Sequence, residues 1–401
     1  MRSVDEHLTE ILGSVRVLPP LDLALLEAQG TVLAEPVSAP VPLPPFDNSA
    51  MDGYAVVAAD IAAATDASPV TLPVVGDIVA GDSGVSAIRS GLTARIMTGA
   101  PLPAGADAVI PVEWTDGGNA NVRVFRAAPP GNYIRRAGED VLAGQVVADA
   151  GTRLTAPQLG MIAAVGRPRV TVRPKPRVVV VATGDELREP GSTLAPGQIW
   201  ESNSFMLTAA VVEAGGVGFR QATVEDEPAK VLEMLHDQLV RADAIVTTGG
   251  VSMGTRDVVK EVLAGTGTVD FHKVRMRPGK PQGFGLLEGT PVFTLPGNPV
   301  SAYVSFQVFV RPALLAMQGL APEPLPTVSA VLAEDVKSPA GLRHYLRGRL
   351  SFDRVYSVTA ADVQGSHQLG SLSSANALIE LPEDVEAMPA GSHVNVLRLP
   401  S

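Results

Sequence analysis

The spacing of hydrophobic and polar positions changes near residue 177. From there to about residue 302, short β-branched runs alternate with helical segments; the runs are RVVVVATGDEL (177–187), DAIVTTGG (243–250) and TPVFTLPGNPVSA (290–302). In EPAKVLEMLHDQLVRA, Val231, Leu235 and Leu239 fall four residues apart, as on one face of a helix. This alternation predicts a mostly parallel sheet covered by helices.

The chain before residue 177 has a different pattern. Residues 3–29 are expected to be helical, because SVDEHLTEIL begins with serine and early acids and PPLDLALLEAQG runs from prolines to a glycine. From about 38 to 150, short Val/Ile runs broken by Gly, Pro and Asp predict a small all-β domain. TAPQLGMIAAVG (155–166) returns to helical spacing. The tail from about 322 predicts a small terminal β domain.

Composition limits the classes of protein. A chain of 401 residues with 46% hydrophobic residues should form two to four domains. The absence of cysteine excludes disulfides, thiolate metal sites and a cysteine nucleophile, and the six histidines show no metal-ligand spacing. The net charge of −11 argues against a general nucleic-acid surface. MRSVDEHLTEILGSV lacks the apolar core of a signal peptide, and no apolar run reaches membrane-spanning length, so we expect a cytosolic protein.

The glycine-rich stretch TTGGVSMGTRDVV (247–259) follows a buried-type strand. By itself it is compatible with a tight strand-to-helix turn or with an oxyanion site built from backbone N–H groups. Three predicted strands end in glycine-containing turns, which should meet at one edge of the sheet. We expect four carboxylates to converge there and to suit Mg²⁺: Asp185, Glu186, Asp226 and Asp257.

A basic cluster lies between the glycine-rich stretch and LPGNP. In HKVRMRPGKP (272–281), an extended backbone would place Lys273, Arg275 and Arg277 on one face, with Lys280 nearby. Such a cluster is either a solvent-facing edge strand or an anion site, and the acidic character of the chain favours the anion site. The stretch FDNSAMDGYA (46–55) suits two successive turns on composition alone.

Taken together, these stretches are specific. FDNSAMDGYAV, RIMTGAPLPAGADAVIPVE, IRRAGEDV, VVATGDEL, TTGGVSMGTRD, MRPGKPQGFG and LPGNPVSA occur in this order, and nearly the whole chain resembles molybdopterin molybdenumtransferase, the MoeA family, which includes the E domain of gephyrin. The resemblance implies a multidomain α/β plus β fold. It comprises an elongated helical and strand linker or dimerisation domain (1–40 and 141–173), an inserted β domain (41–140), a central α/β molybdopterin-binding domain (174–321) and a C-terminal β-barrel-like domain (322–401).

The resemblance implies Mg²⁺-dependent insertion of molybdate into adenylylated molybdopterin, with hydrolysis of the adenylate and release of AMP. Glu186, Asp226 and Asp257 match the acidic site positions, with Glu186 and Asp257 as Mg²⁺ ligands, and Asp52 and Thr98 carry over from the inserted domain. Asp52 or Asp226 would orient the attacking water or oxygen. Positions implied to bind substrate are Gly249, Gly250, Ser252, Lys273, Arg277, Lys280, Pro296 and Pro299. Arg277 stands where some members have lysine.

The resemblance also implies partners and leaves alternatives. The family is dimeric, with the inserted domain of one subunit facing the α/β domain of the other, and contact with the adenylyltransferase that supplies the substrate is expected. Neither nucleic acid nor membrane is an expected partner. The alternatives are a molybdopterin adenylyltransferase, a gephyrin-like scaffold and insertion of tungstate in place of molybdate.

Overall fold

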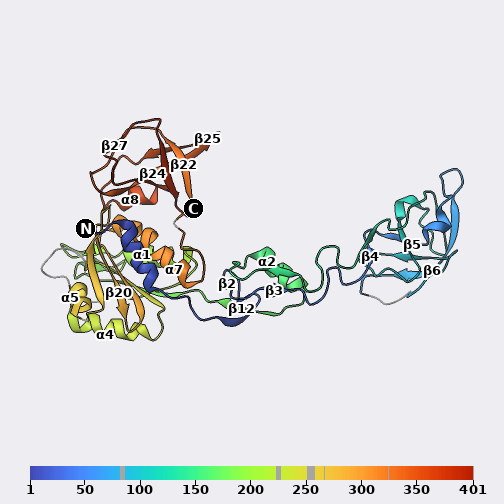
Figure 1. The fold of residues 1–401 in the computed structure, drawn as a ribbon, viewed down its shortest axis with the longest axis horizontal. Coiled ribbons are helices and arrows are strands. Elements are labelled where there is room, and N and C mark those ends of the chain that lie inside the picture. The colour runs from blue at the N-terminus through green and yellow to red at the C-terminus, as the bar shows by residue number, and fades with distance from the viewer. Residues whose placement is uncertain (82–85, 223–226, 251–257, 266, 324, 401) are drawn as a thin grey trace. The chain divides into compact units, whose positions relative to one another are not determined.

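The computed structural model describes residues 1–81, 86–222, 227–250, 258–265, 267–323 and 325–400. Its contacts divide the chain into two compact units, which are described separately here. The first unit contains residues 1–22, 30–34 and 171–401, and the second contains residues 23–29 and 35–170. Figure 1 shows the ribbon and labels some of the elements of each unit.

A six-stranded sheet of the described residues forms the centre of the first unit, in the order β16-β13-β17-β21-β20-β18. The first four strands are parallel neighbours, whereas β20 and β18 continue the sheet antiparallel. The predicted mostly parallel sheet is therefore confirmed. The strands are β13 (Arg177–Ala182), β16 (Val217–Arg220), β17 (Ala244–Thr248), β18 (Val269–Lys273), β20 (Pro281–Leu287) and β21 (Thr290–Leu295).

Helices cover both faces of this sheet. Val178 and Val180 of β13 point into one hydrophobic cluster with α3, while Val179 and Val181 point into another with α4. This alternation follows from the strand geometry and explains why the run of valines is continuous. The helices that precede the barrel in this unit are α1 (Val4–Ser14), α3 (Asn203–Glu213), α4 (Pro228–Leu239), α5 (Val258–Gly265), α6 (Pro299–Ser305), the π-helical turn η3 (Phe306–Val310) and α7 (Arg311–Met317).

The prediction of helix over residues 3–29 is correct only for the first half of the segment. Ser3 and Glu6 form a capping box that starts α1, and α1 ends at Ser14. The second half is instead extended and then turns, with strand β1 (Leu21–Ala24) pairing to β12 (Arg169–Arg173). The backbone N–H of Leu18 donates to the Met317 carbonyl at 2.8 Å. These long-range hydrogen bonds outweigh local helix propensity.

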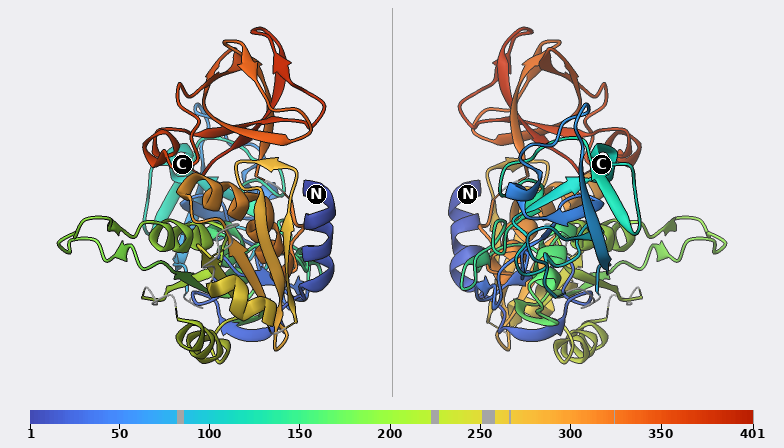
Figure 2. Two further views of the ribbon diagram at one scale, coloured as in Figure 1. Left: turned by 90° about the vertical axis from the view of Figure 1, so that its left-hand side faces the viewer. Right: turned by 90° about the vertical axis from the view of Figure 1, so that its right-hand side faces the viewer.

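The C-terminal region of the first unit is a closed β-barrel, in the order β19-β24-β25-β22-β28-β26 with β24 also paired to β26. Figure 2 shows these strands as a ring. The predicted terminal β domain is confirmed. The elements are β19 (Met276–Arg277), β22 (Thr327–Leu332), β23 (Val336–Lys337), β24 (Arg343–Asp353), β25 (Val355–Ala360), α8 (Leu369–Ser373), β26 (Ala377–Leu381), β27 (Ala387–Met388) and β28 (His393–Arg398).

The second unit is built around the five-stranded sheet β8-β5-β7-β6-β9 of its described residues. Tyr54 and Val56 pack on one face, and Ala55 packs on the other. The predicted small β domain is confirmed. Its elements are β3 (Val37–Ser38), β4 (Asn48–Ser49), β5 (Gly53–Val56), η1 (Ala58–Ile61), β6 (Val70–Ile78), β7 (Thr93–Ile96), β8 (Ala108–Pro111), η2 (Val112–Trp114), β9 (Asn121–Val124), β10 (Ile134–Arg135), β11 (Val146–Ala148) and α2 (Ala156–Ala164).

One helical stretch, Pro299–Met317, is long and apolar enough to cross a membrane, although the sequence pattern predicts no such run. Within the structure, 78% of its apolar window is buried. It packs against the sheet through Val300, Val304 and Phe309. The stretch therefore serves as a core helix of the α/β part.

Candidate active site

The carboxyl ends of β13, β17 and β21 form one edge of the sheet and open onto a cavity of about 560 Å³. Parallel strands bring their carboxyl ends together, as the sequence predicts. The cavity is lined by backbone and side chains of Ala182, Thr183, Glu186, Leu187, Ile199, Trp200, Glu201, Ser202, Asn203, Thr248, Gly249, Gly297, Asn298, Pro299, His367 and Leu369.

A hydrogen-bond network fixes the floor of this cavity. The Asn203 side chain, at the start of α3, donates to Thr248 Oγ1 at 3.0 Å and to the Gly297 carbonyl at 2.7 Å. Thr248 Oγ1 in turn donates to the Pro296 carbonyl at 3.1 Å. Pro296 is buried, and Pro299 is half-buried at the start of α6. This network ties α3 and the two strand ends into one rigid rim.

Gly249 allows the two strand ends to approach closely. Its φ of +91° favours glycine, and a Cβ there would lie 2.7 Å from the Thr183 carbonyl oxygen. Its N–H donates to the Leu295 carbonyl at 3.2 Å. Gly250, also at positive φ, is half-buried beside it. The glycine pair is therefore required by the backbone at this rim.

Glu186 is exposed at the cavity rim. Its carbonyl accepts from the Ile199 N–H at 2.9 Å, which ties the turn after β13 to strand β15 (Ile199–Trp200). Its neighbour Asp185 is exposed but does not line the cavity. The other predicted residues of this rim, Ser252, Asp226 and Asp257, lie outside the described residues.

Lys273 lies at the same sheet edge, farther along it. The strand pairings bring into one row across the sheet Phe271, Gly283, Thr294, Thr247 and Val181. Lys273 lies two residues beyond this row, towards the carboxyl edge, because β18 runs in the direction of β21. It is exposed and is not among the residues that line the cavity.

The basic segment alternates between exposed and buried residues, as predicted. Lys273, Arg275 and Arg277 are exposed, while Val274 and Met276 are buried. Arg277 leaves the sheet and pairs through β19 with His344 of the barrel. Burial and the charges of Arg277 and Arg347 lower the pKa of His344 to about 4. Lys280 is exposed, and its carbonyl accepts from the Val274 N–H at 2.8 Å. These cations create a positive region that favours anions.

Asp52 and Thr98, both exposed, meet in the second unit. Asp52 Oδ1 accepts from the backbone N–H and from the hydroxyl of Thr98, each at 2.7 Å. The pairing of β5 with β7, with Gly53 opposite Ile96, brings the two residues to the same end of the sheet. These two hydrogen bonds lower the pKa of Asp52.

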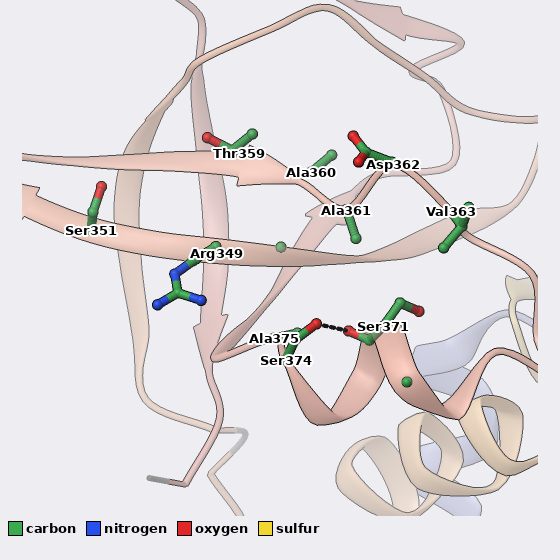
Figure 3. Close-up of a pocket in the computed structure, with 12 residues that line it drawn as sticks. Arg349, Ser351, Thr359, Ala360, Ala361, Asp362, Val363, Ser371, Ser374 and Ala375 are labelled. Atoms are coloured by element: carbon green, nitrogen blue, oxygen red, sulfur yellow. Dashed lines mark hydrogen bonds between the residues drawn. The ribbon is translucent and has the colours of Figure 1, made fainter.

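A second cavity and a cluster of possible metal ligands among the described residues lie apart from the candidate site. A cavity of about 630 Å³ in the barrel region is lined mainly by small side chains, with Arg349 and Asp362 as its charged members (Figure 3). It is larger but contains no residue that the sequence predicts for chemistry. Elsewhere, ligand atoms of Glu10, Asp270 and His272 lie within 4.8 Å of one another. Arg2 already forms an ion pair with Glu10 and supplies positive charge there.

The sequence analysis does not predict several of the residues that line the cavity. Asn203, Asn298 and His367 line the cavity beside Trp200. The Asn298 side chain donates to Ser366 Oγ at 3.0 Å, so the segment before α8 closes the cavity. Two signals were available in the sequence: the Ser-Asn pair that begins α3, and a tryptophan in a chain with only 4% aromatic residues.

Comparisons with known proteins show the family of the chain. Family models match residues 2–166 as the MoeA N-terminal region (domain I and II), residues 179–316 as a "Probable molybdopterin binding domain" and residues 329–399 as the MoeA C-terminal region (domain IV). The chain is 47% identical to molybdopterin molybdenumtransferase 2 of Mycobacterium tuberculosis, covering 99% of both chains. It is 36% identical to molybdopterin molybdenumtransferase of a Nostoc species, covering 94% of this chain and 88% of that protein.

A solved structure agrees over the full length. The molybdopterin biosynthesis MoeA protein of Pyrococcus horikosii superposes with a TM-score of 0.84 at 32% identity, covering 100% of this chain and 99% of that one. The family models, the curated relatives and this structure span the α/β site, the inserted β part and the barrel alike. The chain therefore belongs to the MoeA family.

Proposed function

We propose that this protein is a transferase of molybdenum cofactor biosynthesis. It inserts molybdate into adenylylated molybdopterin, hydrolyses the adenylate and releases AMP. The observation that carries the proposal is the cavity at the carboxyl edge of the parallel sheet, with Glu186 and Gly249 in its lining, in a chain of the MoeA family.

Mg²⁺ fits the residues at the cavity rim. The ion prefers oxygen ligands and commonly takes one or two carboxylates plus phosphate oxygens of a substrate. Glu186 offers such a carboxylate in the cavity lining beside the glycine turn. Asp257, which lies outside the described residues, is the second proposed ligand. When bound, the ion would neutralise charge that develops on the phosphate group during hydrolysis.

The chain's own residues would divide the remaining work. The turn at Gly249 and Gly250, with Ser252, would hold the pterin phosphate; the donor of the pair would be the Gly250 N–H, because the Gly249 N–H donates to the Leu295 carbonyl. Pro296 and Pro299 would shape the adjoining loop. Lys273 and Arg277, with Lys280 nearby, would attract molybdate by charge. Asp52 or Asp226 would orient the attacking water or oxygen. The lowered pKa of Asp52 makes its carboxylate a weak base, which suits orientation better than proton abstraction.

The proposal includes the assembly. We propose a homodimer held by residues 1–40 and 141–173, in which the β domain of one subunit (41–140) faces the α/β domain (174–321) of the other and brings Asp52 and Thr98 to Glu186. Residues 322–401 form the fourth domain of this division. We also propose that the reaction is cytosolic and that the adenylyltransferase hands over the substrate by direct contact.

The test is AMP release from adenylylated molybdopterin with Mg²⁺, with and without molybdate. Molybdate-dependent release by wild type that disappears in Glu186→Ala supports the proposal. Lys273→Ala should mainly raise the molybdate concentration needed for half-maximal rate. Removal of Mg²⁺ by chelation with EDTA should stop the reaction. No turnover by a folded wild-type protein would contradict the proposal, and synthesis of the adenylate from ATP would identify an adenylyltransferase instead.

A further inference from the structure

Trp200 presents an aromatic surface at the cavity. It ends strand β15 (Ile199–Trp200) and is 53% exposed, beside Ile199 at 55%. Both residues line the cavity that also contains Glu186 and Gly249. Large aromatic side chains gain most from burial, and this one is not covered by the core. Its exposure points to a ligand as the group that covers it.

The indole ring is held in one orientation. Its Nε1 donates to the Ser192 carbonyl at 2.9 Å, so the only polar atom of the ring is satisfied within the protein. The backbone pairs with β14 (Leu187–Arg188), with Arg188 opposite Trp200. The Glu201 N–H donates to the Arg188 carbonyl at 2.8 Å. The flat faces of the ring therefore remain as its surface for interaction.

The same loop connects Trp200 with Glu186. The Ile199 N–H donates to the Glu186 carbonyl, so β15 lies directly beside the residue that carries the proposed metal ligand. The segment between β13 and α3, yellow-green in Figure 2, projects from the sheet and carries both residues. A ligand whose phosphate groups face Glu186 and the glycine turn would extend a ring towards Trp200.

Resting on the proposed function, we infer that Trp200 is a substrate-binding residue that stacks on a flat, nitrogen-rich bicyclic ring. Aromatic side chains bind such rings face to face, and a cavity of about 560 Å³ has the volume of a small-molecule site. Two parts of an adenylylated pterin carry this chemistry, the pterin and the adenine. The experiment below distinguishes them.

Tryptophan fluorescence tests the contact without turnover. The chain has two tryptophans, and Trp114 packs in the second unit against Tyr133 and Arg126. Trp114→Phe therefore leaves Trp200 as the only reporter. We expect saturable quenching by 6-hydroxymethylpterin if Trp200 stacks on the pterin, or by AMP if it stacks on the adenine. The matched Trp200→Phe protein, which retains Trp114, should show neither.

Two outcomes of the titration would overturn the inference. One is the absence of quenching by both ligands. The other is emission that depends on protein concentration and not on either ligand, because this would assign Trp200 to a contact between copies of the chain.

Steady-state kinetics give a second readout. Trp200→Ala should raise KM for adenylylated molybdopterin roughly 5- to 100-fold while kcat stays within about threefold, because stacking contributes to substrate and transition state alike. Trp200→Phe should restore most of the affinity. The control is Phe352→Ala, which removes a 65% exposed aromatic side chain on the barrel.

The two proposals fail separately. An unchanged KM in Trp200→Ala, with molybdate-dependent AMP release intact, overturns the stacking role and leaves the proposed function standing. Wild-type protein that releases no AMP overturns the proposed function. Ligand-dependent quenching in the Trp114→Phe protein would still establish the stacking surface in that case.

Discussion

Asp52 Oδ1 accepts two hydrogen bonds from a single residue, Thr98: one from its backbone N–H and one from its hydroxyl, each at 2.7 Å. Both donors stabilise the charged carboxylate and lower the pKa of Asp52. A carboxylate held in this way is a fixed anion that can orient a neighbouring group. It gains this role through β-sheet pairing, which lies outside the α/β part of the fold.

Removing the Thr98 hydroxyl should raise the pKa of Asp52. Thr98→Val deletes one donor and keeps the backbone N–H, so the pKa should move back towards the ordinary value of 3.8, whereas Thr98→Ser should preserve the lowered pKa. Carbon-13 NMR titration of the Asp52 carboxyl measures both. Because the pKa is lowered in the folded state, this contribution to stability is present above pH 3.8 and is lost as pH falls through the folded pKa. An identical titration in both variants would assign the shift to the backbone donor alone.

Subunits carrying complementary defects should restore activity to each other. If Asp52 of one subunit acts with Glu186 of the other, a heterodimer of an Asp52→Ala subunit and a Glu186→Ala subunit contains one intact site and one doubly defective site. Purified with two different tags, it should have about half the wild-type rate of AMP release, while each homodimer is inactive. Light scattering confirms the dimer. An inactive heterodimer of correct mass would contradict a site shared between subunits.

Two adjacent buried threonines should respond differently to the same substitution. Thr248 Oγ1 accepts from Asn203 and donates to Pro296, so Thr248→Val should cost about 1–3 kcal/mol. Thr247 Oγ1 is equally buried but has no hydrogen-bond partner among the described residues, so Thr247→Val should be neutral or stabilising. Urea unfolding of the two variants in one buffer makes the comparison. Equal losses would show that the network does not stabilise the rim.

Gly249→Ala should destabilise the rim of the cavity. The new Cβ would meet the Thr183 carbonyl oxygen at 2.7 Å, at a φ of +91°. We expect a loss of about 1–3 kcal/mol, a lower Tm and impaired AMP release. Gly265→Ala is the control, because no atom lies within 4 Å of its added Cβ at the end of α5. Its Tm should be unchanged or higher, since alanine favours helix. Unchanged stability of Gly249→Ala would refute the steric argument.

The local sequence pattern was sufficient to predict an element wherever the element depends on the spacing of its own side chains. The valines of β13 face two hydrophobic clusters in alternation, and Val231 and Leu235 of α4 are fully buried, as their spacing predicts. The turn after β17 could also be predicted from its glycines, because the positive φ at Gly249 and Gly250 favours glycine. The motifs of the chain identified the family and singled out Asp52 and Thr98 without any coordinates, whereas the hydrogen bonds between these two residues came from the structure.

The sequence by itself thus determined the element types of the α/β part, the edge of the sheet at which the cavity lies and the family. Tertiary structure decided that residues 21–24 form a strand, because their pairing with the distant strand β12 outweighs local helical spacing. It also decided that Asn203 reaches Gly297, that Arg277 pairs with the barrel, and that Trp200 lies beside Glu186. The physical reason is that these relationships depend on strand order and register between segments far apart in the chain, and local periodicity contains no information about either.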